Sequence, residues 1–361
     1  MLWDIFCKVI DNHGDIGVCW RLSTQLAGRG ERVRLWVDDA SALLWMAPRG
    51  HPRVQVLAWA AQAAAQPGQV VVEAFGCELE PAFQAALAEQ ARRGGRQPAW
   101  INLEYLTAEP FAERNHRLPS PLLAGPAAGL TRHFFYPGFT PRTGGLLREA
   151  SLTQRQSQFD RDGWLDVQGI AGGDDARLVS LFCYEPAGLD RLLLQWARAP
   201  RTTRLLATAG RTAAALRSAL HQLDRDNPAW NRDARLSISW LSLLSQRDYD
   251  HLLWACDLNF VRGEDSLVRA LWAGKPLVWH IYPQQDAAHH RKLEAFLDWL
   301  DAPAGLRDFH RAWNGIGGDA PEPDIDSWAA CVDRARERLL AQPDLITQLM
   351  RLALDDLRAG P

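Results

Sequence analysis

The segment FCKVIDNHGDIG, residues Phe6–Gly17, decides the fold prediction. The apolar run from Leu2 to Val9 overlaps its start and is typical of a buried parallel strand. Apolar residues then recur at helical spacing until a glycine ends the pattern. A turn from strand to helix lies at the carboxyl edge of an open α/β sheet, where ligands bind, and the helix N-terminus favours nearby negative charge. Asp11 and Asp15 are therefore candidates for binding or catalysis.

The rest of the chain repeats this alternation of apolar runs and helical stretches. We predict strands over 2–9, 33–37, 54–57, 70–74 and 100–105, and again over 178–183, 205–209, 236–240, 258–261 and 276–279. Strands that alternate with helices indicate doubly wound α/β domains. A polar, glycine-rich stretch separates the two series, so we predict a linker there. The predicted domains are 1–150 and 176–340, with a linker over 151–175 and a C-terminal helix over 341–361.

The aromatic segment His133–Phe139, interrupted by a proline, is harder to place. We favour a packed loop that covers the sheet. The alternative is the lip of a cleft that meets a partner.

Composition excludes several classes of protein. The net charge is −3, which gives no basic surface for nucleic acid. No apolar run approaches the roughly 20 residues that span a bilayer, so no membrane segment is predicted. The N-terminus lacks the pattern of an export signal, so we expect a cytoplasmic protein. The six cysteines are scattered, and we predict buried free thiols.

A second loop, Arg262–Ser266 (RGEDS), follows another predicted strand. A glycine there lets a ligand approach the backbone, and Asp265 or Ser266 can cap the next helix. Together with Arg262, that helix N-terminus suits a phosphate or diphosphate. A capped helix with Arg262 paired to Glu264 explains the same residues equally well.

Other motifs leave narrower choices. Phe182 and Tyr184 stand two apart at a strand end, where they either stack on a base or pack in the core. Asn12 occupies the first glycine position of a dinucleotide-binding loop, which disfavours a nicotinamide enzyme. His289 and His290 are adjacent rather than one helical turn apart, so no metal site is predicted there.

Several long stretches together resemble the EarP family, the protein-arginine rhamnosyltransferases that modify bacterial elongation factor P. They are FCKVIDNHGDIGVCWR (6–21), LWVDDASAL (35–43), INLEYL (101–106), FYPGFTPRTGGLLRE (135–149) and DLNFVRGEDSLVRALWAGKPLVWHIYPQQDAAHHRKL (257–293). The resemblance covers nearly the whole chain. It implies a GT-B glycosyltransferase fold with two Rossmann-like domains facing a central cleft. It also implies dTDP-β-L-rhamnose as donor, an arginine of elongation factor P as acceptor, and inversion at the sugar.

In the N-terminal half, the resemblance implies that Asp15 is the catalytic carboxylate and Asp11 its essential neighbour. Asn12, His13 and Gly14 complete the donor-side loop. Family members more usually carry phenylalanine at the position of His13, so the role of this side chain stays open.

In the C-terminal half, the resemblance implies that Phe182 and Tyr184 hold the thymine and that Gln246 contacts the base. The loop for the diphosphate and sugar comprises Arg262, Gly263, Glu264, Asp265 and Ser266, of which Glu264 is the essential carboxylate. Leu243 stands where the family often has an aromatic residue. Base stacking is therefore weaker here or supplied by the two aromatic residues alone.

The implied chemistry explains the residue types. A protonated guanidinium, with a pKa above about 12, is a poor nucleophile, and an aspartate can hold it and accept its proton. Arg262, Ser266 and the helix N-terminus can stabilise the departing dTDP, so neither a metal nor a cofactor is expected. Activation of elongation factor P for relief of polyproline stalling is the implied outcome. A GT-B sugar-nucleotide epimerase and a non-catalytic module that binds elongation factor P remain the alternatives.

Overall fold

The computed structural model describes residues 1–10, 13–170, 176–283, 288–318 and 320–358. The chain folds into two compact units, Met1–Ala150 with Leu339–Pro361, and Ser151–Arg338. The segment that we expected to be a linker contains two helices of the second unit, α5 (Leu152–Ser157) and α6 (Arg161–Val167). Trp164 and Leu165 of α6 are buried in a core cluster of that unit, which explains why this segment is not a free linker.

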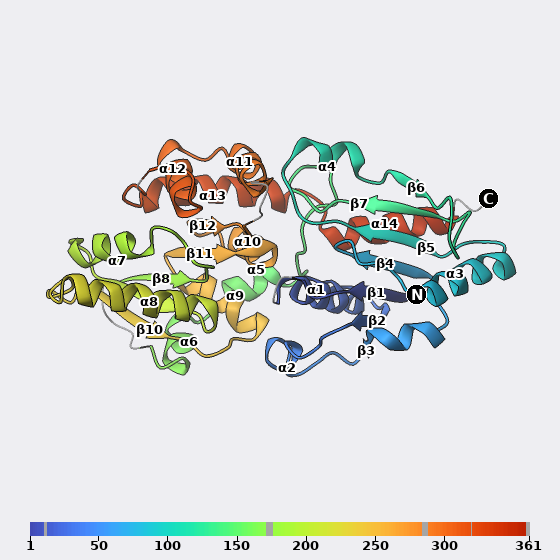
Figure 1. Cartoon of the computed structure of the whole chain (residues 1–361), viewed down its shortest axis with the longest axis horizontal. Coiled ribbons are helices and arrows are strands. Elements are labelled where there is room, and N and C mark those ends of the chain that lie inside the picture. Colours follow the sequence, from blue (N-terminus) through green and yellow to red (C-terminus); the bar gives the residue numbers. More distant parts are fainter. Residues whose placement is uncertain (11–12, 171–175, 284–287, 319, 359–361) are drawn as a thin grey trace. The chain divides into compact units, whose positions relative to one another are not determined.

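The first unit is built on a seven-stranded sheet of order β3-β2-β1-β4-β5-β7-β6 (Figure 1). Its strands are β1 (Leu2–Cys7), β2 (Arg32–Val37), β3 (Val54–Ala58), β4 (Val70–Ala74), β5 (Ala99–Leu103), β6 (Pro119–Pro121) and β7 (Thr131–Phe135). All neighbours pair in parallel except β6, which runs antiparallel to β7. The central strand β1 is almost fully buried, as its apolar sequence predicts.

The prediction of a loop for the aromatic segment His133–Phe139 is wrong in its first half. His133–Phe135 belongs to β7, which pairs in parallel with Ile101–Leu103 of β5. Aromatic residues favour strands, and the proline of the motif stands only after the strand has ended. The sequence pattern alone did not show that β5 needed another partner.

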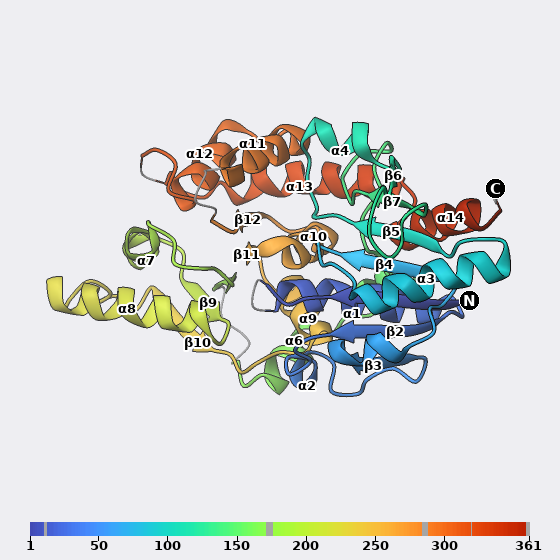
Figure 2. The ribbon, with the colours of Figure 1, turned by 45° about the vertical axis from the view of Figure 1, so that its right-hand side comes forward.

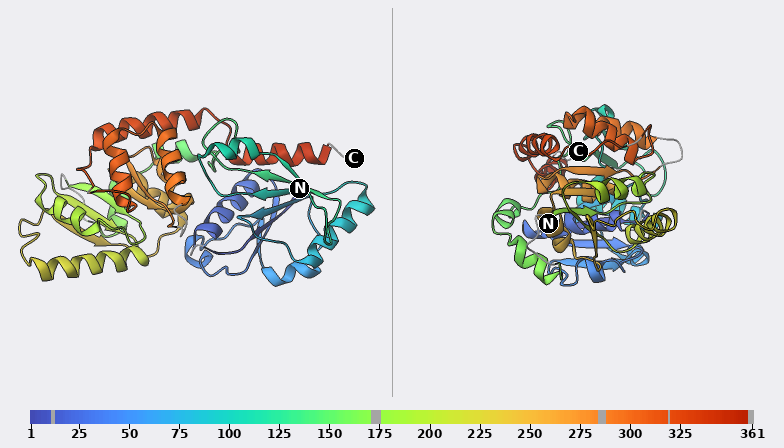
Figure 3. Two further views of the ribbon diagram at one scale, coloured as in Figure 1. Left: turned by 45° about the horizontal axis from the view of Figure 1, so that its top comes forward. Right: turned by 90° about the vertical axis from the view of Figure 1, so that its left-hand side faces the viewer.

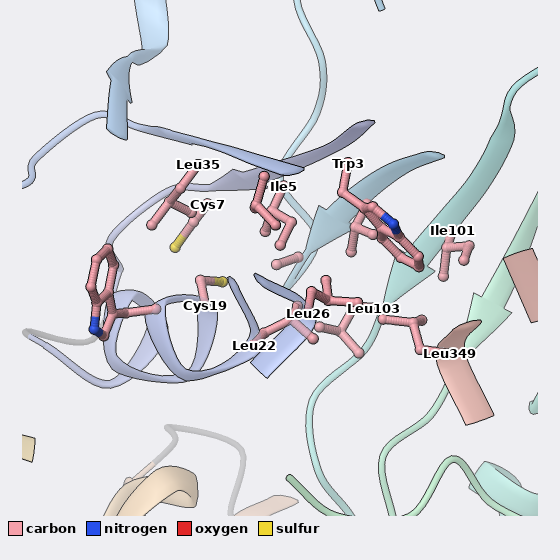
Figure 4. Packing of buried hydrophobic residues seen from close by; sticks show 14 of the residues in the cluster. Trp3, Ile5, Cys7, Cys19, Leu22, Leu26, Leu35, Ile101, Leu103 and Leu349 are labelled. Atoms are coloured by element: carbon pink, nitrogen blue, oxygen red, sulfur yellow. The ribbon is translucent and has the colours of Figure 1, made fainter. Parts of the chain in front are cut away.

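Helices cover both faces of this sheet. They are α1 (Gly14–Gly28), α2 (Leu43–Met46), α3 (Pro81–Gly94), α4 (Pro110–Asn115), α14 (Leu345–Arg358) and the 3-10 helix η1 (Trp59–Ala64). One core cluster joins α1 and α14 to the sheet, with Leu22 and Leu26 of α1 and Leu349 of α14 beside Trp3 and Ile101 (Figure 4). A second cluster joins α3 and η1 to the opposite face (Figure 2). The C-terminal helix α14 therefore completes the first unit.

The second unit holds a five-stranded, all-parallel sheet of order β10-β9-β8-β11-β12. The strands are β8 (Arg177–Leu181), β9 (Thr203–Ala207), β10 (Leu236–Trp240), β11 (Leu258–Arg262) and β12 (Leu277–His280). Its other helices are α7 (Leu189–Arg198), α8 (Arg211–Asp226), α9 (Gln246–Ala255), α10 (Gly263–Ala273), α11 (Ala288–Leu300), α12 (Ala304–Trp313) and α13 (Ile325–Leu340). Helix α12 contacts β12, whereas α7 contacts β10 and α8 contacts β9. Helices α11 to α13, in orange to red, lie together on one side of this unit (Figure 3).

Each sheet reverses its strand order at one point. In the first unit the chain builds β1, β2 and β3 outward and then returns to place β4 on the other side of β1. In the second unit it builds β8, β9 and β10 and then places β11 beside β8. Ligands of open α/β sheets bind at the carboxyl ends of the two strands that flank such a reversal. Candidate ligand sites are therefore the carboxyl ends of β1 and β4 in the first unit, and of β8 and β11 in the second.

All six cysteines are free and buried, as predicted. Within the described residues, no helix combines the length and apolar character that crossing a membrane requires.

Candidate active site

The reversal point of the second unit brings together residues far apart in the sequence. Phe182 follows β8, and its backbone N–H donates to Phe260 O of β11 at 3.0 Å. Arg262 ends β11, and its guanidinium carbon lies 4.4 Å from the centre of the Phe182 ring and 4.8 Å from that of Tyr184. Arg262 also donates to the Cys183 carbonyl at 3.3 Å. The aromatic pair and the loop arginine predicted from sequence therefore form one cluster.

Tyr184 is the most enclosed member of this cluster, at 2% exposed. Its ring lies 5.0 Å from the Arg211 guanidinium, 5.3 Å from the His280 ring and 5.6 Å from the Tyr282 ring. Because Arg262 also contacts this ring, Tyr184 lies at the centre of the cluster. Arg262 lies over both rings, and Phe182 is the less buried of the two.

Sequence reasoning did not assign Arg211, His280 or Tyr282 to the site. Arg211 donates to Glu185 through Nε at 3.0 Å, and this pairing lowers the pKa of Glu185. His280 ends β12, and Tyr282 follows it, so their place at a strand's carboxyl end was the available signal. Burial lowers the pKa of His280 to about 3, so its imidazole is neutral at physiological pH.

The Arg262–Ser266 loop begins α10 directly. Gly263 has a φ of 66°, a left-handed conformation that favours glycine. Ser266 Oγ accepts from the Arg262 backbone N–H at 3.0 Å and donates to its carbonyl, while Trp279 Nε1 donates to Gly263 O at 2.8 Å. Glu264 and Asp265 lie in the first turn of α10. Glu264 forms an ion pair with Lys292 of α11.

Gln246 and the Arg262–Ser266 loop stand at the starts of two helices, α9 and α10, that are joined by a buried ion pair. Gln246 is the first residue of α9, whose N-cap Ser245 accepts from the Asp248 N–H at 3.1 Å. Asp250 of α9 accepts two hydrogen bonds from Arg269 of α10, both at 2.8 Å, and both side chains are 1% exposed. The buried ion pair fixes α9 against α10. Leu243, in the loop before α9, is exposed.

The reversal point of the first unit contains Asp15. This residue lies in the first turn of α1, and its Oδ2 accepts from the Ile10 backbone N–H at 2.9 Å. It is 5% exposed, so the carboxylate is held in one place near a helix N-terminus. Asp11 and Asn12 lie outside the described residues.

The rest of the first loop is described by contacts at the start of α1. His13 precedes the helix, its carbonyl accepts from the Gly17 N–H at 3.0 Å, and its ring meets Trp45 of α2 edge-on at 5.3 Å. Gly14 is the first helical residue. The side chain of His13 is exposed and contacts α2 through Trp45.

Residues 3–353 match the family model for "Elongation-Factor P (EF-P) rhamnosyltransferase EarP". The protein-arginine rhamnosyltransferases of Pseudomonas aeruginosa and Pseudomonas putida are 41% and 43% identical over 98% and 96% of this chain, and over 99% and 97% of their own. A solved structure described as the structural basis for EarP-mediated arginine glycosylation of translation elongation factor EF-P matches with a TM-score of 0.65. Its identity is 32%, over 98% of this chain and 99% of that one. The predicted GT-B fold is confirmed, and the chain belongs to the EarP family of EF-P rhamnosyltransferases.

Proposed function

We propose that this enzyme transfers L-rhamnose from dTDP-β-L-rhamnose to an arginine side chain of EF-P, with inversion at the sugar. The modified factor would then relieve stalling at polyproline sequences. Family membership over nearly the whole chain supports the reaction class and the acceptor. The observation that carries the mechanism is Asp15, a nearly buried carboxylate at the sheet's reversal point, held by the Ile10 N–H.

The second unit is the proposed donor site. A diphosphate at the start of α10 would meet the helix N-terminus, the Arg262 guanidinium and the Ser266 hydroxyl. Phe182 offers an aromatic face for the thymine, and Gln246 stands at the start of α9 for a polar contact to the base. His280, whose imidazole is neutral, and Tyr282 belong to the same cluster, because both rings pack against Tyr184.

The proposed chemical step needs one proton acceptor. A guanidinium nitrogen attacks C1 of rhamnose as the C1–O bond to the diphosphate breaks, and dTDP leaves with the electron pair. The attacking nitrogen loses a proton, which Asp15 accepts. Positive charge from Arg262 and the α10 N-terminus stabilises the departing dTDP. Direct displacement by the nitrogen inverts the configuration at C1.

Intact-mass analysis of EF-P after incubation with the enzyme and dTDP-rhamnose tests this function. A gain of one deoxyhexose, located on an arginine by fragmentation, is the expected result. A changed sugar nucleotide with unmodified EF-P would indicate an epimerase, and no change in either would indicate a binding module.

Replacing Arg262 with alanine is expected to weaken dTDP binding by roughly 10- to 100-fold, because a hydrogen bond to a charged group contributes about 1.5–3 kcal/mol. Calorimetric titration with dTDP measures the effect. Arg338→Ala is the matched control, since Arg338 also covers an aromatic ring, that of Trp299 at 5.2 Å, but on α13. Equal dTDP affinity of the Arg262 variant and the wild type would show that the diphosphate does not bind at this loop.

Transfer is expected to survive an excess of EDTA. The described residues contain no group of three or more His, Cys, Asp or Glu placed to hold a metal ion. Arg262 and the α10 N-terminus supply positive charge for the diphosphate instead. Measuring turnover before and after chelation, and again after adding Mg²⁺ or Mn²⁺, tests the expectation. Activity that the chelator abolishes and the metal restores would assign the acidic residues to a metal.

A further inference from the structure

Lys292 of α11 enters the donor site through Glu264. Its ammonium group donates to Glu264 Oε1, and the two side chains are only 20% and 19% exposed. Lys292 lies 28 residues further along the chain. Its pairing with Glu264 is a tertiary contact between α10 and α11, partly withdrawn from solvent.

Glu264 stands where a carboxylate is electrostatically unfavourable for the donor. It lies in the first turn of α10, next to Asp265, at the proposed site of a diphosphate that carries negative charge itself. Like charges about 6–10 Å apart at an effective dielectric constant of about 20 weaken binding by roughly 10- to 100-fold. A carboxylate at this position therefore needs a compensating cation if a diphosphate is to bind beside it.

The charges around the second unit's reversal point balance only when Lys292 is counted. Arg211, Arg262 and Lys292 carry positive charge, and Glu185, Glu264 and Asp265 carry negative charge. Arg211 binds Glu185, and Lys292 binds Glu264. Arg262, which contacts the aromatic rings, is the third cation. Without Lys292 the cluster would carry a net charge of −1 before any diphosphate arrived.

We propose that Lys292 is a positioning residue of the donor site, which neutralises Glu264 and holds its carboxylate so that a nucleoside diphosphate can bind beside it. The inference rests on the proposed donor function of the second unit. Lys292 acts through Glu264 and touches no reacting atom. The site would thereby keep a carboxylate available for a hydroxyl-rich sugar without repelling the diphosphate that carries this sugar.

Calorimetric titration with dTDP, which lacks the sugar, separates charge balance from catalysis. Lys292→Met is expected to lower dTDP affinity roughly 10- to 100-fold, because it exposes the nucleotide to the uncompensated Glu264 charge. Lys292→Arg should retain most of the affinity. The double variant Lys292→Met with Glu264→Gln should regain dTDP affinity, because the repelling charge is gone, while transfer stays impaired.

Lys275→Met is the matched control, since Lys275 precedes β12 and therefore lies at the opposite edge of the sheet. It should leave dTDP affinity unchanged. Circular dichroism confirms that each variant is folded, and Lys292→Gln carries the same expectation should Lys292→Met not fold.

The outcomes distinguish this inference from the proposed function. Wild-type protein that binds no dTDP would contradict the proposed donor. Equal dTDP affinity of the wild type and Lys292→Met would overturn the role of Lys292 and leave the proposed donor intact. A loss in Lys292→Met that Glu264→Gln does not rescue would also overturn it, because a purely structural lysine gives that result.

Discussion

Replacing Asp15 with asparagine is expected to lower turnover by roughly 100- to 10,000-fold, the range that a general base contributes. Asparagine keeps the size of the side chain, and its amide oxygen can still accept from the Ile10 N–H. It cannot accept the proton that the attacking guanidinium releases. Because Asp15 belongs to the first unit, dTDP-rhamnose binding should change little.

Single-turnover transfer to EF-P, followed by intact mass, measures the chemical step, and calorimetry measures donor affinity separately. Asp38→Asn is the matched control. Asp38 follows β2 at the same sheet edge, and its Oδ1 accepts from the Val9 and Asp39 N–H groups, both at 3.0 Å. Its backbone contacts resemble those of Asp15, yet it should retain transfer. Full turnover by Asp15→Asn would contradict the proposed role of this carboxylate.

Most strands of both sheets were predictable, because apolar or alternating runs between helical stretches indicate strands. Val70–Ala74 and Leu236–Trp240 were predicted with the bounds that the structure shows. The strand at Thr131–Phe135 was missed because an aromatic run next to a proline fits a loop equally well. Only its parallel pairing with β5 decides between the two, and pairing depends on the rest of the sheet.

That the C-terminal helix packs on the first unit could not be predicted from sequence, for a similar reason. The apolar face of α14 is visible in its sequence, but any apolar surface could have covered it. In the structure Leu345, Ile346 and Leu349 join the core formed by α1 and the first sheet. A helical pattern specifies a face to be buried, whereas tertiary packing selects its partner.

In the candidate site, too, the local segments were predictable from sequence and the tertiary contacts were not. The loops were predictable from their position, since glycine, arginine and carboxylates at the carboxyl ends of strands indicate ligand binding. The contacts between distant segments were not. Nothing in the spacing of Glu264 and Lys292 predicts their ion pair, and nothing in the sequence predicts that two arginines lie against the ring of Tyr184.

Replacing Asp250 with alanine is expected to cost about 3–5 kcal/mol of unfolding free energy, because it leaves a buried guanidinium without its carboxylate. Arg269 is 1% exposed and donates two hydrogen bonds of 2.8 Å to Asp250. Asp250 joins α9, which begins with Gln246, to α10, which begins at the Arg262 loop, so dTDP affinity should fall as well.

Urea unfolding measures the loss of stability, and the double variant Asp250→Leu with Arg269→Met tests its cause. Replacing both charges with apolar side chains of similar volume removes the unpaired charge, so most of the lost stability should return. Glu89→Ala is the surface control, since its pairs with Arg92 and Arg93 on α3 are solvent-exposed and should contribute little. Unchanged stability in Asp250→Ala would mean that water or another group satisfies Arg269. The buried pair would then not be what holds the donor loop against α9.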